Sequence, residues 1–371
     1  MKGTVLITGG AGFIGSHLAR ELLRAGYHVR VLDSLVTQVH GDTPDRPSYL
    51  HKDAEFILGD VRNPELVDEA LSGVDAVYHF AALVGVGQSM YQIAEYTSVN
   101  NLGTGVLLER LVKQRVSKLI VASSMSIYGE GAYVTPSGEL HHQAVRTVKQ
   151  LKARQWEMFT PEGLPLRPVA TPESKQPSLA SVYALSKYDQ EQMCLMVGRA
   201  YGIPAVALRF FNAYGPYQSL SNPYTGVLAI FAARLLNGKR PIIFEDGQQL
   251  RDFVSVYDIA RACRLALEVN EAQDQVFNVG SGHETTILEV AERLAKVLGK
   301  KLEPEITGNY RVGDIRHCYP DMSLTQRVLG YKPAMSLEAG VRDLAEWLEQ
   351  QTAQDRFNEM QQELASRGLV V

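Results

Sequence analysis

The first half of the chain alternates short apolar runs with amphipathic segments. The apolar runs are TVLIT (4–8), HVRVLD (28–33), AEFILGD (54–60), AVYHFAA (76–82) and KLIVASS (118–124). Between them, HLARELLRAG (17–26), PELVDEALSG (64–73) and TGVLLERLVKQ (104–114) repeat apolar residues at helical spacing. Strands that alternate with helices predict βαβ units and hence a parallel sheet with helices on both faces. Runs without strict apolar–polar alternation fit such a sheet, because its strands are buried on both sides.

The pattern breaks down between about residues 131 and 180, where prolines recur. One charged piece in this stretch, HHQAVRTVKQLKARQW (141–156), has helical spacing, and we predict an insertion that folds over a neighbouring site. Beyond it, periodicity predicts a long helix at 182–202, a strand at 205–211, and helices at 227–238 and 286–299. The polar tail after Trp347 is predicted to be helical, with Phe357, Met360 and Leu364 on one side, docked on its own domain or on a second subunit.

Composition narrows the class of protein. The net charge of −4 is spread along 371 residues with no basic block, so nucleic acid is not expected as a partner. The three cysteines lie far apart without a CxxC pair, so neither a disulfide framework nor a cysteine zinc site is expected. The chain opens on a strand, which leaves no room for a signal peptide, and it holds no apolar run long enough to span a bilayer. These features predict a cytoplasmic enzyme without a membrane partner.

A glycine-rich turn joins the first strand to the first helix. It reads Gly9-Gly10-Ala11-Gly12-Phe13-Ile14-Gly15. Glycines at 9, 12 and 15 permit a tight turn, close approach of a pyrophosphate and close packing of helix on strand. The helix N-terminus would then face the phosphates, and Phe13 and Ile14 of the turn are candidate cofactor contacts. Glycines that merely make a turn remain the alternative.

An acid follows the glycine turn at the distance that dinucleotide sites require. Asp33 ends the second strand, where it would accept hydrogen bonds from the adenosine ribose and repel a 2′-phosphate. This predicts NAD rather than NADP as the cofactor. Asp60 and Val61 after the third strand are candidates to frame the adenine. Phe80, Ala81 and Ala82 after the fourth are candidates to line the pyrophosphate path, although each of these residues taken alone is better explained by packing than by contact with the cofactor.

Tyr183 and Lys187 stand four residues apart at the start of the long helix, and therefore on one face. A free tyrosine has a pKa near 10 and is a poor base at neutral pH. An adjacent ammonium and the positive nicotinamide ring would favour its phenolate. With Ser124 at the end of the fifth strand, the pair becomes a candidate general base for an alcohol from which hydride departs.

Several motifs together resemble an extended short-chain dehydrogenase/reductase of the nucleotide-sugar epimerase/dehydratase type. They are GGAGFIGSHL, YHFAA, SVNNLGT, SSMSIYG, YALSK, LRFFNAYGP, RDFVSVYDIA and FNVGSG, and they extend over roughly residues 3–350. The resemblance implies a Rossmann-type doubly wound parallel sheet with a smaller mixed α/β C-terminal domain for a nucleoside-diphosphate sugar, dTDP- or UDP-linked. It implies a Rossmann domain at 1–190 with returning segments near 205–215 and 250–265, a substrate domain mainly at 191–350, and a tail at 351–371. A homodimer is also expected.

The resemblance also assigns roles to residues. It implies a catalytic triad of Ser124, Tyr183 and Lys187, in which Tyr183 and Lys187 also contact the cofactor and Asn100 supports the site. By the same similarity, Asn212 would contact the sugar nucleotide, and Arg251 and Arg311 its diphosphate, with Arg316 as a third cation. Bidentate Arg–phosphate contacts make such a role physically sensible.

The residues after Ser124 favour one reaction within the family. The family's 4,6-dehydratases place an Asp-Glu pair directly after this serine or threonine, and its decarboxylases resemble them in carrying a Glu at the second position. Here Met125 and Ser126 stand there, with Ser126 a candidate substrate contact. Eliminating water or carbon dioxide then has no obvious agent, whereas reversible oxidation needs no carboxylate. The arrangement therefore resembles the 4-epimerases.

Other details bear on the substrate. Two segments, SNPYTGVLAIF (221–231) and GDIRHCYPD (313–321), look most like those of bacterial dTDP-L-rhamnose 4-epimerases. Many of those proteins carry CxxC pairs in the insertion. This chain has no such pair there, so no metal is expected. The alternatives are a dehydratase or decarboxylase that draws on Glu139, Glu162 or Glu173, and a UDP-hexose or UDP-N-acetylhexosamine 4-epimerase. More distant ones are a hydroxysteroid-type dehydrogenase, which would leave Arg251 and Arg311 without a ligand, and a dinucleotide-sensing regulator.

Overall fold

A computed structural model describes residues 2–42, 45–141, 144–220, 222, 224, 226–311, 314–349, 351, 355 and 357–370. Its centre is a seven-stranded sheet in the order β13-β9-β5-β4-β1-β2-β3, with every pair parallel. The strands are β1 (Thr4–Thr8), β2 (His28–Asp33), β3 (Glu55–Leu58), β4 (Ala76–His79), β5 (Lys118–Ser124), β9 (Ala205–Phe210) and β13 (Val276–Val279). The predicted doubly wound sheet is confirmed, and the order reverses between β1 and β4, where such folds bind ligands.

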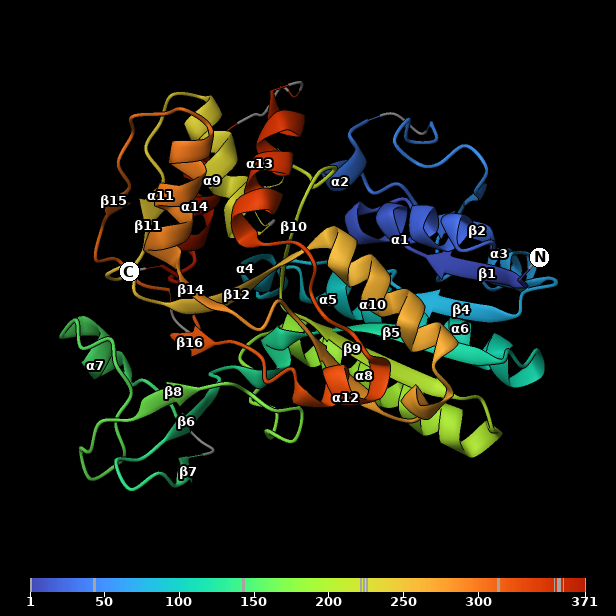
Figure 1. Cartoon of the computed structure of the whole chain (residues 1–371), viewed down its shortest axis with the longest axis horizontal. Coiled ribbons are helices and arrows are strands. Elements are labelled where there is room, and N and C mark those ends of the chain that lie inside the picture. The colour runs from blue at the N-terminus through green and yellow to red at the C-terminus, as the bar shows by residue number, and fades with distance from the viewer. Residues whose placement is uncertain are drawn as a thin grey trace.

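Helices cover both faces of this sheet (Figure 1). One face carries α1 (Phe13–Arg24), α10 (Val256–Glu268) and α12 (Ser323–Leu329), and the other carries α3 (Pro64–Leu71), α6 (Gly103–Lys113) and α8 (Val182–Tyr201). Along β1, Val5 and Ile7 join the first apolar cluster while Leu6 joins the second, as the two-residue period of a strand requires. Both clusters are fully buried, which explains why these strands are apolar throughout.

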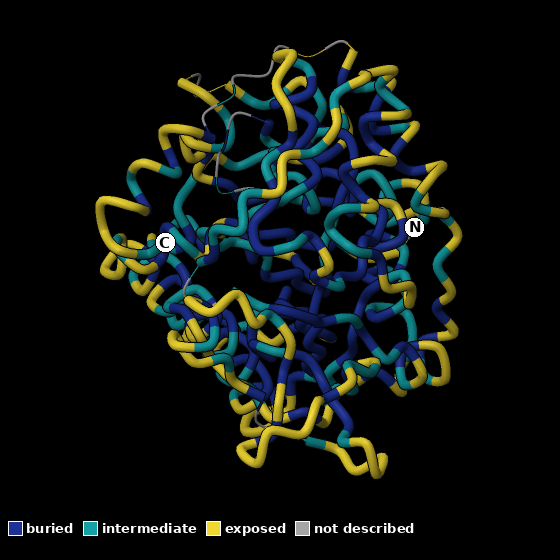
Figure 2. The backbone as a smooth tube through the Cα atoms, turned by 90° about the vertical axis from the view of Figure 1, so that its left-hand side faces the viewer, coloured by how far each residue is buried: buried dark blue, intermediate teal, exposed yellow. Residues whose placement is uncertain are grey.

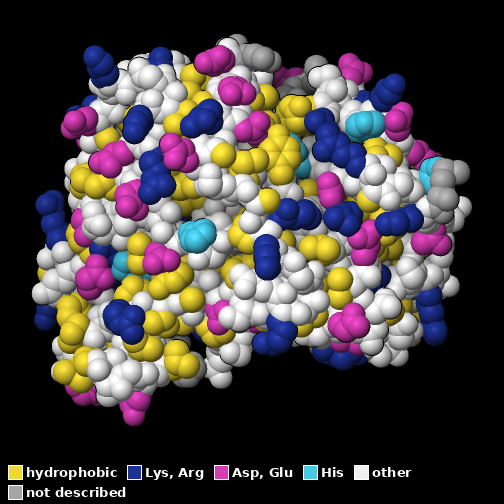
Figure 3. Space-filling view, viewed as in Figure 1, with side chains coloured by type: hydrophobic (Ala, Val, Ile, Leu, Met, Phe, Trp, Pro, Cys, Tyr) yellow, Lys and Arg dark blue, Asp and Glu magenta, His cyan; other side chains and the backbone are white. Residues whose placement is uncertain are grey.

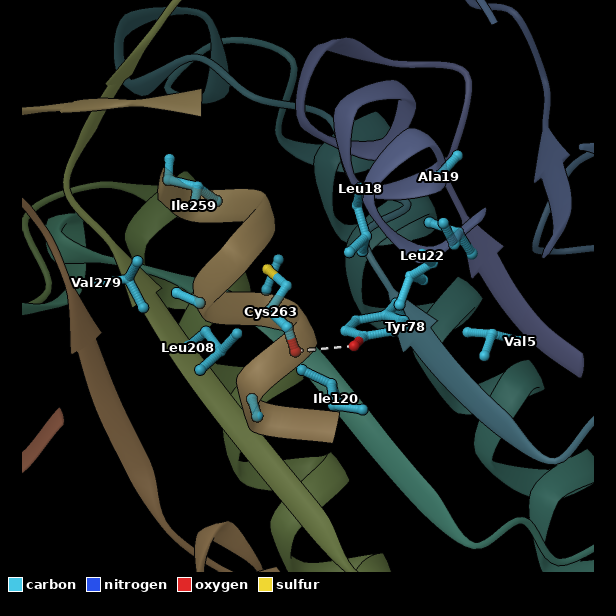
Figure 4. Packing of buried hydrophobic residues seen from close by; sticks show 14 of the residues in the cluster. Val5, Leu18, Ala19, Leu22, Tyr78, Ile120, Leu208, Ile259, Cys263 and Val279 are labelled. Atoms are coloured by element: carbon cyan, nitrogen blue, oxygen red, sulfur yellow. Dashed lines mark hydrogen bonds between the residues drawn. The ribbon is translucent and has the colours of Figure 1, made fainter. Parts of the chain in front are cut away.

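The packing of α10 against the sheet is seen at close range in Figure 4. Cys263 and Ile259 of α10 and Leu18 of α1 lie over the strands around Tyr78. The hydroxyl of the fully buried Tyr78 donates to the carbonyl of Cys263 at 2.8 Å. This bond satisfies the one polar atom that burying a tyrosine brings into the core.

A smaller unit stands beside the C-terminal ends of the central strands. It contains α9 (Val227–Leu236), α11 (Ile287–Val297), α13 (Leu337–Leu348) and β11 (Ile242–Ile243), which share an apolar cluster, and the exposed strand β15 (Glu305–Ile306), which pairs with β11. A second sheet lies where it meets the central unit, made of β10 (Asn212–Tyr214), β12 (Leu250–Ser255), β14 (Glu284–Thr286) and β16 (His317–Cys318). Short helical segments complete the description: α2 (Thr37–His40), α4 (Val86–Ser89), α5 (Ile93–Tyr96), the π-helical turn Thr97–Leu102, and the 3₁₀ turns Met125–Tyr128 and Asn270–Ala272.

The insertion folds as its own small sheet. Its strands β6 (Ala132–Val134), β7 (Leu140–His141) and β8 (Arg167–Val169) pair antiparallel, and it projects at the lower left of Figure 1. Figure 2 shows it as a mostly exposed segment below the buried centre, and Figure 3 shows apolar side chains over it. Those exposed apolar residues include Leu140, Val145, Val148, Phe159 and Leu164.

The helix predicted at 141–156 is wrong. Only α7 (Val148–Lys152) is helical, and His141 belongs to β7, while residues 142 and 143 lie outside the described residues. Thr147 caps α7 by accepting from the backbone N–H of Gln150. Just before the cap, Arg146 reaches 2.6 Å from Glu245 of the smaller unit. A long-range ion pair therefore holds this part of the chain where periodicity alone predicts a helix.

The tail ends in α14 (Phe357–Ser366) and docks on its own chain. Phe357, Met360 and Leu364 are buried against Phe244, which confirms the side predicted from their spacing. Beyond the helix, Val370 forms a backbone bridge with Arg311. Across the described residues, no helix is both long and apolar enough to cross a membrane.

Candidate active site

The glycine turn lies at the point where the strand order reverses. Gly9 has a positive φ of 69°, and a Cβ on it would come within 2.7 Å of the backbone nitrogen of Ala81. A Cβ on Gly15 would lie 2.6 Å from the carbonyl of Gly9. Glycine is therefore required at both positions by backbone crowding, and the turn and the segment after β4 line one crevice. Gly12 caps α1, so the helix begins at Phe13, inside the predicted turn, and Phe13 and Ile14 form its first turn.

Asp33 stands at the end of β2 beside this turn. Its Oδ2 accepts from the backbone N–H of Ala11 at 3.0 Å, and its Oδ1 accepts from that of Leu35 at 3.0 Å. A groove of about 370 Å³ opens beyond it, lined by Ser34, Leu35, Thr37, Gly41, Asp42, Leu58, Gly59 and Asp60. A carboxylate fixed by backbone N–H groups at the mouth of a groove of this size fits the adenosine half of a dinucleotide.

The other predicted cofactor residues differ in accessibility. Asp60 lines the groove and pairs with Arg62 at 2.6 Å, whereas Val61 is buried in the core beneath α6. Phe80 packs edge-on against Phe210, while Ala81 and Ala82 continue from β4 past the glycine turn.

Asn100 fixes the loop that follows Ala82. Its Oδ1 accepts from the N–H of Leu83 at 2.7 Å, and its Nδ2 donates to the carbonyl of Leu83 and to the Ser186 hydroxyl. Asn100 thus joins the segment after β4 to α8, which gives physical content to its predicted supporting role.

The structure brings Ser124, Tyr183 and Lys187 together at the same edge of the sheet. Ser124 ends β5, and its hydroxyl is hydrogen-bonded to that of Tyr183, one residue into α8. Ser181 caps α8, and Ser89 of α4 accepts from the N–H of Tyr183 at 3.0 Å. Burial raises the pKa of Tyr183, and the hydrogen bond to Ser124 opposes this rise. A further positive charge beside the phenol is therefore needed to make it a base.

Along α8, Lys187 is the cation nearest to Tyr183 in sequence. Its ammonium donates to Oε1 of Gln190 at 2.6 Å, and burial lowers its pKa to about 8. At neutral pH most of the lysine still carries its charge, because that pH lies below this value. A protonated, buried Lys187 one turn from Tyr183 is the charge that the chemistry calls for.

The rim next to Ser124 holds no carboxylate at the positions that follow it. Ser124 Oγ caps the turn Met125–Tyr128 by accepting from the N–H of Ser126 at 3.1 Å, and the two serine hydroxyls lie 3.0 Å apart. Met125 is buried with Phe211 and Cys318 in a separate apolar cluster. Of the acids considered as substitutes, Glu139 and Glu162 are exposed, and Glu173 accepts from the backbone of Asn278.

Three predicted substrate residues lie on the sheet that meets the smaller unit or close to it. Asn212 belongs to β10, which runs parallel to the β12 strand of Arg251. The Oδ1 of Asn212 and the Nε of Arg311 are buried, with no hydrogen-bond partner in the part of the chain that the structure describes. Arg311 also stacks over the ring of Phe244 at 4.5 Å, and Arg251 donates to the carbonyls of Ile315 and Arg316. Unsatisfied buried polar atoms of this kind suit a polar ligand.

Arg316, the third predicted cation, is placed differently. Its side chain is 0% exposed and forms ion pairs with Glu157 at 2.5 Å, Glu245 at 3.0 Å and Asp246 at 2.6 Å. The insertion supplies Glu157, and the smaller unit supplies the other two acids. The structure therefore does not present Arg316 as a free cation, because three carboxylates occupy its guanidinium.

The sequence motifs assign no role to some residues that surround the site. Gln190, His79 and Thr104 form a buried polar group around Lys187, and Ser89 supports Tyr183. Gln190 lies three residues after Lys187, which is a weak signal of a shared helix face, but the partners from β4 and α6 become neighbours only through the fold. Among the described residues, no group of three or more His, Cys, Asp or Glu is arranged to hold a metal ion.

Comparison with known proteins assigns the chain to a family. The NAD dependent epimerase/dehydratase family matches residues 5–149 and 161–280. A dTDP-L-rhamnose 4-epimerase of Burkholderia thailandensis is 37% identical over 359 residues, covering 95% of this chain and 96% of its own. A putative UDP-glucose 4-epimerase of Methanocaldococcus jannaschii is 32% identical, covering 93% of this chain and 98% of its own.

Solved structures support the same family assignment. A UDP-glucose 4-epimerase of Thermotoga maritima, solved with UDP-glucose, superimposes with a TM-score of 0.76 at 31% identity and covers 93% of this chain and 98% of its own. The family depends on NAD, which confirms the predicted cofactor, and it is a family of enzymes. This chain belongs to the NAD-dependent epimerase/dehydratase family of nucleotide-sugar enzymes.

Proposed function

We propose that this enzyme is a nucleoside-diphosphate-sugar 4-epimerase and that its sugar nucleotide is dTDP-L-rhamnose. The observation that carries the reaction is the rim at Ser124, where Ser126 lies beside it and Met125 is buried, so that hydroxyls stand beside Tyr183 without an acid at these positions. Oxidation and reduction at C4 need a base and a hydrogen-bonding hydroxyl, whereas elimination also needs a positioned acid.

The residues divide the reaction between them. When bound, NAD would supply reversible hydride transfer at C4, so that the sugar could be oxidised there and then reduced on the opposite face. Tyr183 removes the proton of the C4 hydroxyl and later gives it back, while Ser124 hydrogen-bonds the reacting oxygen. Lys187 stabilises the phenolate of Tyr183 with its positive charge. No net oxidation results, so the cofactor is regenerated in every cycle.

Epimerisation also requires the keto sugar to rotate within the site without dissociating from the enzyme. Arg251 and Arg311 are the candidates to hold the diphosphate during this rotation, with Asn212 beside the sugar. The buried unsatisfied atoms of Asn212 and Arg311 support this assignment. Arg316 is left out of it, because its charge is already balanced by three carboxylates.

The rhamnose assignment has separate support. The relative at 37% identity is named for that substrate and covers nearly the whole of this chain. Other relatives and solved structures are named for UDP-sugars, so a UDP-hexose is the outcome that competes with it.

The test is product analysis without added NAD. The purified protein is incubated with dTDP-L-rhamnose, UDP-glucose, UDP-N-acetylglucosamine and UDP-glucuronate, and products are examined by mass spectrometry and NMR. A product of unchanged mass inverted at C4 supports the proposal and names the sugar, whereas loss of water or carbon dioxide would refute it. Tyr183→Phe should abolish conversion, while Tyr201→Phe, at the exposed end of the same helix, should leave it intact.

We also propose that the enzyme works as a homodimer. Exposed apolar side chains gather on α5, the π-helical turn and α8, which pack against one another, and they include Ile93, Leu102, Leu185 and Met196. Surfaces of this kind mark protein interfaces. Sedimentation velocity should show a dimer that Leu102→Lys with Met196→Lys dissociates; a wild-type monomer would contradict the proposal.

A further inference from the structure

We propose that Gln190 is a positioning residue for the reaction, which holds the Lys187 ammonium through its amide oxygen, and that Thr104 and the carbonyl of Ala81 fix this amide in the required orientation. The inference rests on the proposed function, because it concerns the same lysine. It adds a residue outside the Ser–Tyr–Lys set.

The contact itself is short and dry. Lys187 Nζ lies 2.6 Å from Gln190 Oε1, and the two residues are 3% and 0% exposed. An ammonium buried to this extent loses its hydration and requires protein acceptors in exchange. Gln190 Oε1 is the one side-chain acceptor that hydrogen-bonds this ammonium in the described part of the chain.

The orientation of the Gln190 amide follows from its other neighbours. Its Nε2 lies 2.9 Å from Thr104 Oγ1 and 3.3 Å from the carbonyl oxygen of Ala81, and it is 3.1 Å from Nε2 of His79. The Thr104 hydroxyl gives its own proton to the carbonyl of Asn100 at 2.5 Å, so its oxygen is left to accept. Both oxygens therefore require the NH₂ group, and a flipped amide would point N–H donors at an ammonium. The oxygen must face Lys187.

The support extends to the cofactor crevice. His79, at the end of β4, places Nε2 at 2.8 Å from Thr104 Oγ1 and Nδ1 at 2.8 Å from Thr8 Oγ1. Thr8 immediately precedes the glycine turn, and its hydroxyl oxygen also accepts from the N–H of Ala81. Burial and the charge of Lys187 lower the pKa of His79 to about 3, so the ring is neutral and adds no charge. One satisfied network thus connects the glycine turn to the catalytic lysine.

The titratable groups around Lys187 do not replace the neutral amide of Gln190 as the hydrogen-bond acceptor for its ammonium. Lys187 is faced by His79 from β4 and by Tyr183, Glu191 and Cys194 on its own helix. Only Glu191 is an acid, and its carboxylate pairs with Arg209 at 2.7 Å and accepts from the Ser123 hydroxyl. Burial already works against the ammonium, so without the oxygen of Gln190 the lysine would lose its proton more readily and cease to favour the Tyr183 phenolate.

The experiment compares Gln190→Met, Gln190→Glu and a control, Gln192→Met. Methionine keeps the length of the side chain and removes the acceptor, whereas glutamate keeps an acceptor and adds negative charge. Gln192, on the same helix, bonds Glu191 at 3.3 Å, and within the described part of the chain it forms no hydrogen bond with Lys187. The first readout is the titration of Lys187 by NMR of ε-¹³C-labelled lysine in the NAD-loaded enzyme, with the resonance assigned by its absence in Lys187→Arg.

We expect the titration midpoint to fall in Gln190→Met, to rise in Gln190→Glu and to stay in place in Gln192→Met. In the epimerase assay, kcat of Gln190→Met should fall about 10- to 100-fold, as expected for losing a hydrogen bond to a charged group, with KM for the sugar nucleotide nearly unchanged. The alkaline limb of kcat should move in the same directions as the midpoints.

The outcomes separate the two proposals. Midpoints that stay in place, or that move the same way in both Gln190 variants, would overturn the role of Gln190, since a merely structural residue gives no opposite shifts. Failure of the wild type to convert any sugar nucleotide would instead overturn the proposed function, because the NMR titration needs no substrate. If Gln190→Met does not fold, as judged from its melting curve, the upward shift in Gln190→Glu carries the test alone.

Discussion

Replacing Arg316 by methionine distinguishes a structural cation from a diphosphate-binding one. Arg316 lies where the insertion meets the smaller unit, and its guanidinium pairs with Glu157, Glu245 and Asp246. Methionine has a comparable volume, so the substitution removes the charge with little change in packing. We expect the protein to lose stability and the sugar nucleotide to bind as before.

The size of the stability loss depends on the partners that each carboxylate keeps when Arg316 is replaced. Breaking a buried ion pair by removing one partner costs about 3–5 kcal/mol of unfolding free energy. Here the lower end applies, because Glu157 and Asp246 are 50% and 37% exposed and can be solvated by water, and Glu245 retains Arg146 at 2.6 Å. A loss of about 3 kcal/mol corresponds to a fall of about 6 °C in melting temperature at about 2 °C per kcal/mol, the lower limit for large domains.

The assay is thermal unfolding together with KM for the sugar nucleotide. Glu157→Gln is the matched control, since it removes one half-exposed partner while Arg316 keeps the other two, and it should cost no more than about 1 kcal/mol. An Arg316→Met protein that melts like the wild type but shows a several-fold higher KM would refute the reasoning and restore Arg316 as a ligand of the diphosphate.

Further predictions concern the catalytic charge, the glycine turn and the tail. Turnover should fall as pH rises through about 8, because burial lowers the pKa of Lys187 to that value and only the ammonium favours the phenolate; a kcat profile that stays flat up to the ordinary range of lysine would contradict this. Gly15→Ala should lose bound NAD, since its Cβ would lie 2.6 Å from the backbone of Gly10 and Gly9. The control Gly105→Ala lies in α6 with open space around it. It should keep NAD and gain about 0.5–1 kcal/mol in unfolding free energy. Leu364→Asp should release the tail to limited proteolysis and Gln362→Asp, on the exposed side of α14, should not, as mass spectrometry of the fragments would show.

The sequence predicts the central sheet well because the local pattern and the fold agree there. Each βαβ unit repeats an apolar strand and an amphipathic helix, and the burial of β1 on both faces reproduces the run TVLIT without alternation. The same agreement holds in the tail, where the spacing of Phe357, Met360 and Leu364 predicts the buried side. It fails at 141–156, where Arg146 is held by the distant Glu245, a contact that no window of sequence contains.

The residues of the candidate site also differ in how far local sequence predicts them. Ser124, Tyr183, Lys187 and the glycine turn belong to motifs, because each depends on a local strand–turn–helix geometry that a few adjacent residues can encode. The charge on Lys187 depends instead on Gln190, held by the Thr104 hydroxyl and the carbonyl of Ala81, which come from separate elements. A motif can therefore name the residues that react, while the protonation state in which they react is set by contacts between distant parts of the chain. Arg316 shows the converse, since the family resemblance suggests a third cation for the diphosphate, but carboxylates far apart in sequence pair with its guanidinium.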